Sequence, residues 1–287
     1  MDMNISKVAV VGAGTMGSGI AQVAATSEMD VLLIDLSDQA LQRGVDGIRK
    51  SLDRLAAKGV LAPAQAQAAV GRIKPTSDPA GAAEAQIVIE AVFENYDIKR
   101  DLMSRLDASC PPETILASNT SSISITRLAA CTRRADRVIG MHFMNPVPLM
   151  ALVELVRGMA TSQDTYDATR QLALNLKKTP VEVNDSPGFV SNRVLMPMIN
   201  EAVFALYEGV GTREAIDTVM KLGMNHPMGP LTLADLIGLD VCRDILNVLY
   251  DGFKDPKYRP CPLLRKMVDA GFLGRKSGRG FYEYPRS

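Results

Sequence analysis

Short apolar runs alternate, over the first two thirds of the chain, with longer stretches in which apolar residues recur at helical spacing. The runs predict buried strands, because a strand covered on both faces presents no polar side. We expect strands at residues 8–11, 31–34, 86–92, 114–118, 137–141, 152–156 and 180–183. We expect helices at residues 17–24, 38–58, 63–70, 97–109 and 163–177. In the helix at 97–109, Ile98, Leu102 and Leu106 share one face. This alternating order is typical of an α/β fold built on a parallel sheet.

The composition changes after residues 184–188, and every later apolar stretch has helical spacing. We expect helices at 189–206, 213–222, 231–250 and 262–270, the first of them bent at Pro197. We therefore predict a Rossmann-type dinucleotide-binding domain over residues 1–183 and a smaller all-helical domain over residues 184–287. The stretch 231–250 is apolar on nearly every side, which is typical of a helix in a core or an interface. This pattern predicts a homodimer formed through the helical domain.

Charge and cysteine content narrow the function classes. The 287 residues include 32 basic and 32 acidic side chains, so charge does not indicate nucleic acid or an anionic membrane as a partner. No apolar run reaches the ~20 residues of a membrane span, and the first strand begins too early to leave room for a signal segment. The four cysteines lack the spacing of a metal site, which favours reduced thiols and no bound metal. We expect a cytoplasmic protein.

A glycine turn joins the first strand to the first helix, with the sequence Gly12-Ala13-Gly14-Thr15-Met16-Gly17. In the dinucleotide fingerprint, the first glycine permits the tight turn and the second lets a pyrophosphate approach the backbone. The third lets helix and strand pack closely, while the helix N-terminus offers N–H groups to the phosphates. Asp35 ends the second strand about 20 residues downstream, where a carboxylate holds the ribose hydroxyls. Because a carboxylate would repel a 2′-phosphate, the motif predicts NAD in preference to NADP.

Short polar side chains follow two of the predicted central strands. Glu94 comes after the strand at 86–92, and Asn119-Thr120-Ser121-Ser122 follows the strand at 114–118. Ligands bind beyond the carboxyl ends of strands in open α/β sheets, so these side chains are expected to face the cofactor. Short polar residues also form ordinary helix caps, and the pattern alone leaves both interpretations open.

One of the two histidines lies opposite a glutamate in a predicted hairpin. If the hairpin is centred near Pro148, His142 and Glu154 face each other at ~5 Å. The carboxylate would then orient the imidazole and stabilise its protonated form, leaving the other nitrogen to take a proton from substrate. A lone histidine is more often a core or surface residue, but the matched glutamate favours catalysis here. His226 has no comparable partner and is expected to be structural.

Five motifs together identify a family resemblance that runs essentially from end to end. They are the glycine turn, Ser118-Asn119-Thr120-Ser121-Ser122, His142-Phe143-Met144-Asn145-Pro146-Val147-Pro148, the run 186–193, and the closing run 274–282. With these motifs the chain resembles the short-chain L-3-hydroxyacyl-CoA dehydrogenase family. Later motifs are more specific than the glycine turn alone.

The resemblance implies roles for the matching residues. His142 would be the general base and Glu154 its orienting partner, with Ser121 and Asn192 positioning the substrate. The implied cofactor contacts, beyond the glycine turn and Asp35, are Glu94, Lys99, Asn119, Ser121, Asn145 and Lys276. The implied contacts to the coenzyme A portion are Ser51 and Lys58.

The resemblance implies reversible NAD-dependent oxidation of an (S)-3-hydroxyacyl-CoA to the 3-oxoacyl-CoA. The substrate it indicates within this class is 3-hydroxybutyryl-CoA. Two other function classes stay open. One is an NAD enzyme acting on a free hydroxy acid or sugar acid, and the other is an NAD-binding protein without catalysis. Oxidation of NADH by acetoacetyl-CoA but not by free acetoacetate would separate these possibilities.

Overall fold

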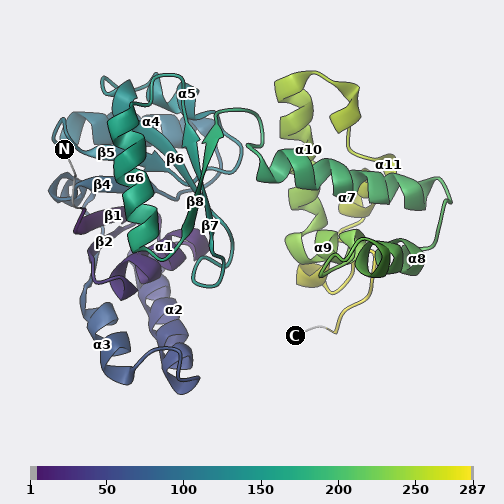
Figure 1. Cartoon of the computed structure of the whole chain (residues 1–287), viewed down its shortest axis with the longest axis horizontal. Helices are drawn as coiled ribbons and strands as arrows, with labels where there is room; N and C mark the ends of the chain where they lie inside the picture. The colour runs from purple at the N-terminus through teal and green to yellow at the C-terminus, as the bar shows by residue number, and fades with distance from the viewer. Residues whose placement is uncertain (1–4, 286–287) are drawn as a thin grey trace. The chain divides into compact units, whose positions relative to one another are not determined.

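Eight strands form a single sheet in the computed structural model, which describes residues 5–285 (Figure 1). They are β1 (Lys7–Val11), β2 (Asp30–Ile34), β3 (Ile73–Thr76), β4 (Ile87–Glu90), β5 (Ile115–Ser118), β6 (Val138–Phe143), β7 (Leu152–Arg157) and β8 (Thr179–Asn184). Their order across the sheet is β3-β2-β1-β4-β5-β6-β7-β8. Strands β1 to β6 are parallel, which is the arrangement of a doubly wound dinucleotide-binding sheet. The predicted α/β fold is confirmed.

The last two strands, β7 and β8, run opposite to the other six. Strand β7 pairs antiparallel with β6, and β8 pairs parallel with β7. In the β6–β7 register, His142 stands directly opposite Glu154. The hairpin register predicted from the sequence is therefore confirmed.

Helices flank the sheet, and local signals define where they begin. They are α1 (Thr15–Thr26), α2 (Asp38–Ala57), α3 (Pro63–Gly71), α4 (Tyr96–Ser109), α5 (Ile125–Ala129) and α6 (Gln163–Asn175). Ser37 and Asn95 cap α2 and α4, since their side chains accept hydrogen bonds from backbone N–H groups three residues on. Pro63 opens α3 at the position where a missing N–H costs least. Helices α2 and α3 lie side by side beyond the sheet (Figure 1).

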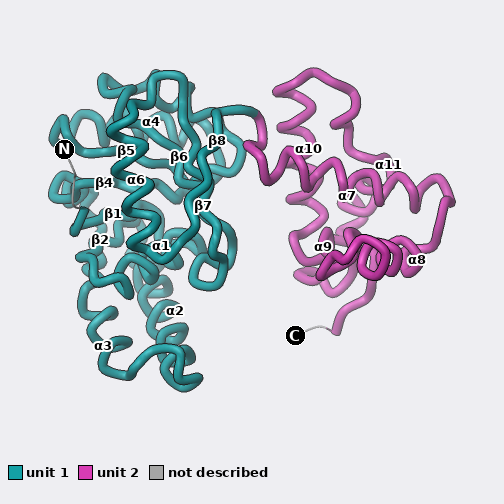
Figure 2. Tube along the Cα trace, in the orientation of Figure 1, with its two compact units in different colours: residues 1–186 teal, residues 187–287 magenta. Residues whose placement is uncertain are grey.

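The chain divides into two compact units, residues 1–186 and 187–287 (Figure 2). The second unit is helical, with α7 (Ser191–Tyr207), α8 (Arg213–Thr218), α9 (Pro230–Ile237), α10 (Leu239–Phe253) and α11 (Pro262–Asp269). A short π-helical segment, Val219–Gly223, continues from α8. The core of the second unit is formed by buried side chains of α7, α9, α10 and α11, among them Ile199, Leu231, Leu246 and Leu264.

The stretch predicted as one helix over 231–250 is instead two helices. Gly238 separates them with φ +107°, a conformation that residues with a side chain rarely adopt. Each shorter helix buries one face, represented by Leu231 and Leu246, while Leu236 is exposed. The apolar pattern on many sides therefore comes from two helices that bury different faces.

Helix α4 buries a face that shares Leu106 with the predicted one but is otherwise shifted along the helix surface. Ile98 is 48% exposed, whereas Lys99, Met103 and Leu106 are buried. The cause is an ion pair between Lys99 and the fully buried Glu90 of β4, which turns this face of the helix toward the sheet.

Three further features concern the described residues as a whole. None of the helices within residues 5–285 is long and apolar enough to cross a membrane. The same residues contain no group of three or more His, Cys, Asp or Glu side chains arranged to hold a metal ion. All four cysteines are free thiols, as expected from their spacing.

Candidate functional site

The glycine turn between β1 and α1 has the conformation that the fingerprint requires. Gly12 has φ +107°, and its N–H donates to the Ile34 carbonyl at 2.7 Å. A Cβ on Gly12 would lie 2.5 Å from the carbonyl oxygen of Ala91. A Cβ on Gly17 would collide with the carbonyl oxygen of Gly12, while Met16 packs against the core. The glycines therefore allow β1 and α1 to approach closely.

The start of α1 is open to a ligand. A Cβ on Gly14 would meet nothing within 4 Å. Helix α1 begins at Thr15, and no side chain caps its N-terminus. Asp35 lies beside this turn, where its two carboxylate oxygens accept hydrogen bonds from Ala13 N at 2.8 Å and Ser37 N at 3.0 Å. Open backbone donors at a helix N-terminus suit a pyrophosphate, and an adjacent carboxylate suits a ribose. The turn fits a dinucleotide.

Glu94 organises the loop that follows β5. Its Oε1 accepts hydrogen bonds from Thr120 Oγ1 at 2.5 Å, Ser121 N at 2.9 Å, and Ser122 N and Oγ at 3.0 Å. Burial would raise the pKa of Glu94, but the charge of Lys99 and these hydrogen bonds outweigh it, so the pKa is lowered. The side chain is therefore a carboxylate at neutral pH and fixes the position of Ser121.

Lys99 projects into a buried network beneath this loop. Its Nζ lies 2.5 Å from Glu90 Oε1, 3.2 Å from the Val92 carbonyl and 3.4 Å from Glu94 Oε2. The other oxygen of Glu90 accepts from Ser118 Oγ at 2.5 Å. Three acceptors surround an ammonium that has three donors, so the donors of Lys99 are used within the protein. Lys99 is linked to the loop after β5 only through Glu94.

The imidazole of His142 has a partner at each nitrogen. Nδ1 lies 2.7 Å from Glu154 Oε2, and Nε2 lies 3.1 Å from Ser121 Oγ. His142 and Glu154 are 6% and 2% exposed. A carboxylate at Nδ1 favours the tautomer with its proton on that nitrogen, which leaves Nε2 as an acceptor. The loop held by Glu94 and the β6–β7 hairpin thus meet at this histidine.

Two asparagines flank the end of β6. Asn119 is buried, and its Oδ1 accepts a hydrogen bond from Phe143 N at 2.9 Å, which ties the end of β5 to β6. Asn145 precedes a cis peptide bond to Pro146 and lines the cavity of this unit. Asn145 therefore borders open space. The side-chain oxygen of Asn119, in contrast, is already used by its hydrogen bond to β6.

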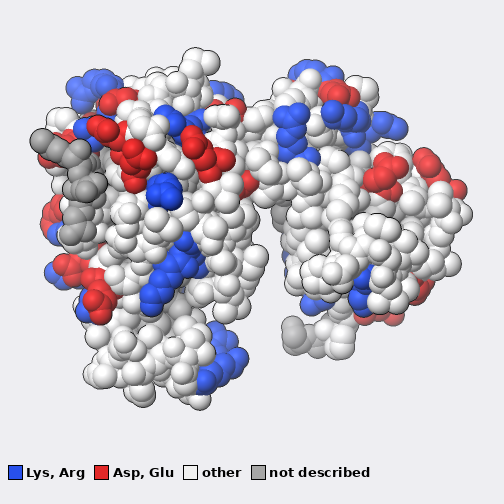
Figure 3. Space-filling model, in the orientation of Figure 1, with Lys and Arg blue, Asp and Glu red and all other residues white. Residues whose placement is uncertain are grey.

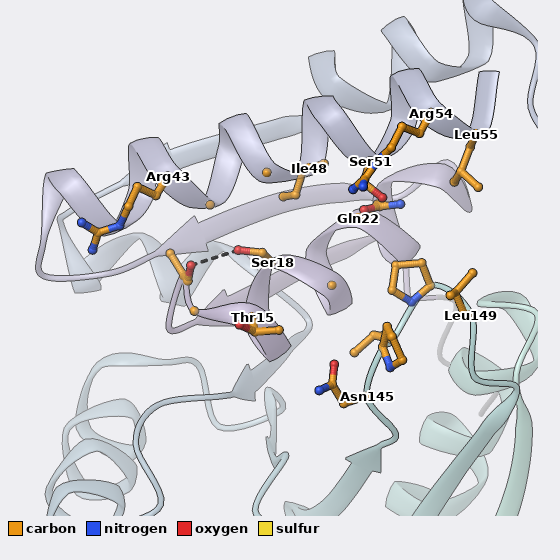
Figure 4. Close-up of a pocket in the computed structure, with 18 of the residues that line it drawn as sticks. Thr15, Ser18, Gln22, Arg43, Ile48, Ser51, Arg54, Leu55, Asn145 and Leu149 are labelled. Atoms are coloured by element: carbon orange, nitrogen blue, oxygen red, sulfur yellow. Dashed lines mark hydrogen bonds between the residues drawn. The ribbon is translucent and has the colours of Figure 1, made fainter. Parts of the chain in front are cut away.

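A cavity of about 680 Å³ lies between α1, α2 and the segment 145–149 (Figure 4). One face of α2 lines it with Arg43, Gly47, Ile48, Ser51 and Arg54, and Lys58, directly after the helix, completes this side. The predicted cofactor residues Gly14, Thr15 and Asn145 open on the same space as the predicted coenzyme A contacts Ser51 and Lys58.

The cavity wall is basic. Arg43, Arg54 and Lys58 contribute cations, and none of the described residues that line it is acidic. Figure 3 shows Lys and Arg side chains over α2, whereas the surface over α3 is mostly uncharged. Such a wall suits a ligand that carries phosphates.

Two buried polar residues near the site, Glu90 and Gln22, were not predicted. Glu90 lies inside an apolar strand and Gln22 inside the first helix, where a polar residue has no distinctive spacing. Their burial, which no sequence pattern signals, is what distinguishes them.

Two predicted site residues belong to the second unit. Asn192 lies in the first turn of α7 and is buried. Lys276 lies in a short 3₁₀ helix, Arg275–Ser277, and donates to Asp240 Oδ2 at 2.6 Å. Burial would raise the pKa of Asp240, but Lys276 outweighs it and the pKa is lowered.

Comparison with known families gives a match over nearly the whole chain. The model of the 3-hydroxyacyl-CoA dehydrogenase NAD binding domain matches residues 7–186. The model of the 3-hydroxyacyl-CoA dehydrogenase C-terminal domain matches residues 188–284.

Individual relatives are similar over their full length. A probable 3-hydroxybutyryl-CoA dehydrogenase of Bacillus subtilis is 57% identical over 98% of both chains. The 3-hydroxybutyryl-CoA dehydrogenase of Bradyrhizobium diazoefficiens is 52% identical over 98% of this chain and 96% of its own. The crystal structure of (S)-3-hydroxybutyryl-CoA dehydrogenase from Ralstonia eutropha has a TM-score of 0.96 at 54% identity, covering 99% of this chain and 100% of that one.

Proposed function

The chain belongs to the 3-hydroxyacyl-CoA dehydrogenase family and is an NAD-dependent oxidoreductase; we propose that it interconverts (S)-3-hydroxybutyryl-CoA and acetoacetyl-CoA. Relatives that are 52–57% identical carry the name of this activity. The observation that carries the proposal is the buried contact between His142 Nδ1 and Glu154 Oε2 at 2.7 Å, which leaves Nε2 directed at the Ser121 hydroxyl.

His142 is the proton-transfer residue in this proposal. In the direction of oxidation, Nε2 takes the proton of the substrate's 3-hydroxyl, and the charge that develops on the ring is stabilised by Glu154. In the direction of reduction, the same nitrogen returns the proton to the 3-oxo oxygen. NAD supplies the hydride acceptor when it is bound.

Positioning is the task of the remaining residues. Ser121 holds the reacting oxygen, because its hydroxyl already lies 3.1 Å from Nε2. Glu94 fixes the backbone of Ser121, and Lys99 acts on the cofactor side through Glu94. We assign Asn192 to the substrate and Asn145 and Lys276 to the cofactor.

The cavity along α2 is assigned to the coenzyme A portion of the substrate. Ser51 and Lys58 line it together with Arg43 and Arg54, and phosphates form charge-assisted hydrogen bonds with such cations. The glycine turn, with Asp35 beside it, is assigned to NAD.

We propose a homodimer formed through the helical unit, in the cytoplasm. Large apolar side chains of that unit are between 60% and 80% exposed, namely Val194, Val210, Leu222 and Met224. Apolar groups of this size suit burial against a second copy. The free thiols are typical of a reducing compartment. Light scattering during size-exclusion chromatography measures the mass, and a monomer at micromolar concentration would contradict the dimer.

The proposed activity is tested by following NADH absorbance with acetoacetyl-CoA and with free acetoacetate. We expect oxidation of NADH only with the thioester. Turnover of free acetoacetate at the same rate would favour a free hydroxy acid as substrate. Binding of NADH without turnover of either compound would favour a non-catalytic protein.

A further inference from the structure

A buried carboxamide lines the cavity of the first unit. Gln22 lies on α1, is 3% exposed, and is one of the residues around the cavity. Within residues 5–285 its side chain makes no hydrogen bond to the protein. Among the described residues, the buried side-chain atoms without a partner are Asp185 Oδ1 and Asp240 Oδ1, so the amide of Gln22 is not sealed in the core and faces the open space of the cavity. The cavity is thus where Gln22 would find a partner.

Both polar and apolar groups surround Gln22 in the cavity. Figure 4 draws Gln22 at the same end of the cavity as Ser51 and Arg54 of α2, with no bond between them. The hydroxyl of Ser51 adds one donor and acceptor, and Ile48 and Leu55 supply apolar wall.

A glycine on the facing helix keeps this space open. Gly47 lies one turn before Ser51 on α2, lines the cavity, and would place a Cβ in contact with nothing within 4 Å. Glycine inside a helix lowers its stability. Gly44 has a packing reason, since its Cβ would lie 2.8 Å from Ser18 Oγ, but Gly47 has none in the protein.

We propose that Gln22 is a substrate-recognition residue that binds an amide of the pantetheine arm of an acyl-CoA thioester, alongside Ser51 and the bare backbone at Gly47. This inference rests on the proposed function. A carboxamide offers two donors and one acceptor and therefore matches another amide. Gln22 lies seven residues beyond Thr15, about 10 Å along the helix from the turn assigned to the pyrophosphate of NAD. It therefore serves a different part of the bound molecules.

The test replaces Gln22 by methionine, which has nearly the same shape and no amide. We expect the KM for acetoacetyl-CoA to rise about tenfold, because a hydrogen bond in a buried site is lost. The KM for NADH stays unchanged, and the thermal unfolding midpoint does not fall, since no protein partner is lost. The matched control is Gln67→Met on α3, an exposed glutamine that does not line the cavity. An unchanged KM for acetoacetyl-CoA in Gln22→Met, or a raised KM for NADH, would overturn the assignment.

A truncated substrate identifies the part that Gln22 contacts. With acetoacetyl-pantetheine, which lacks the nucleotide, the KM ratio of Gln22→Met to wild type should equal that measured with acetoacetyl-CoA. A ratio of one would place the contact on the nucleotide and contradict the pantetheine assignment.

Calorimetric titration of coenzyme A separates this inference from the proposed function. If wild-type protein fails to oxidise NADH with acetoacetyl-CoA, the proposed function fails. Weaker binding of coenzyme A to Gln22→Met than to wild type would still support the site, and equal binding would refute it.

A second substitution tests whether the open space beside Gly47 is needed for substrate binding. Gly47→Ala should raise the unfolding midpoint by a few degrees through helix propensity, yet raise the KM for acetoacetyl-CoA. Gly71→Ala in α3 is the control, because its Cβ also meets nothing within 4 Å but does not line the cavity. It should be stabilised without a change in KM, and the same behaviour in Gly47→Ala would contradict the proposal.

Discussion

Replacing Glu154 by glutamine removes the charge that faces His142 while keeping the shape of the side chain. Both residues are buried, and Oε2 lies 2.7 Å from Nδ1, so the contact is a short one in a site that water reaches poorly. A hydrogen bond to a charged group contributes about 1.5–3 kcal/mol, against about 0.5–1.5 kcal/mol for a neutral one. The difference of about 1–2 kcal/mol applies to the protonated ring that forms during oxidation. At 1.36 kcal/mol per tenfold, kcat should fall about 5- to 30-fold.

The assay is the change in NADH absorbance at saturating substrate, measured in both directions. Glu182→Gln is the matched control, because Glu182 lies on the neighbouring strand β8, is about half-exposed, and pairs with Arg157 at 3.1 Å. An exposed pair of this kind contributes little, so kcat should be unchanged. The reasoning would be refuted if Glu154→Gln folded normally and kept a kcat within twofold of wild type.

Three further changes follow from buried ionisable groups. Lys99→Met leaves the buried carboxylate of Glu90 without a compensating charge. The free energy of unfolding, measured by denaturant titration, should therefore fall by about 3–5 kcal/mol. A loss below about 1 kcal/mol would contradict the buried ion pair. The pKa of Asp107 is lowered from 3.8, because hydrogen bonds from neighbouring arginines outweigh burial. Its stabilisation is therefore present above pH 3.8 and is lost as the pH falls through the lowered value. Asp107→Asn should be less stable at pH 7 and lose less stability on acidification, measured as unfolding midpoints. Burial and nearby carboxylates raise the pKa of Cys242 to about 12. A thiol reagent at pH 8 should therefore label the part-exposed Cys131 before Cys242. Mass spectrometry of peptides reports the order of labelling, and labelling of Cys242 first would contradict this prediction.

The sequence was most informative where a pattern repeats or a motif fixes geometry. Apolar runs predicted the strands because buried parallel strands contain few polar residues. The register that pairs His142 with Glu154 could be counted from the sequence, because opposed residues in a hairpin have a constant sum of positions. The glycine turn was predictable because only glycine tolerates the backbone at Gly12.

Tertiary context determined what periodicity could not. The buried face of α4 includes Lys99, which periodicity assigns to the polar side, because Glu90 supplies a charge beneath it. Two helices replace the single one expected over 231–250, since the conformation of Gly238 is not evident from an apolar pattern. The unpartnered amide of Gln22 emerged only from its burial beside a cavity.

Proton transfer by His142 is the central claim, and the kcat of His142→Gln tests it most directly. With acetoacetyl-CoA and NADH, kcat should fall by about 10²–10⁴-fold, the usual contribution of a positioned acid–base group, while NADH binding measured by fluorescence is retained. A kcat within a few fold of wild type, in a protein that still binds NADH, would show that another group transfers the proton.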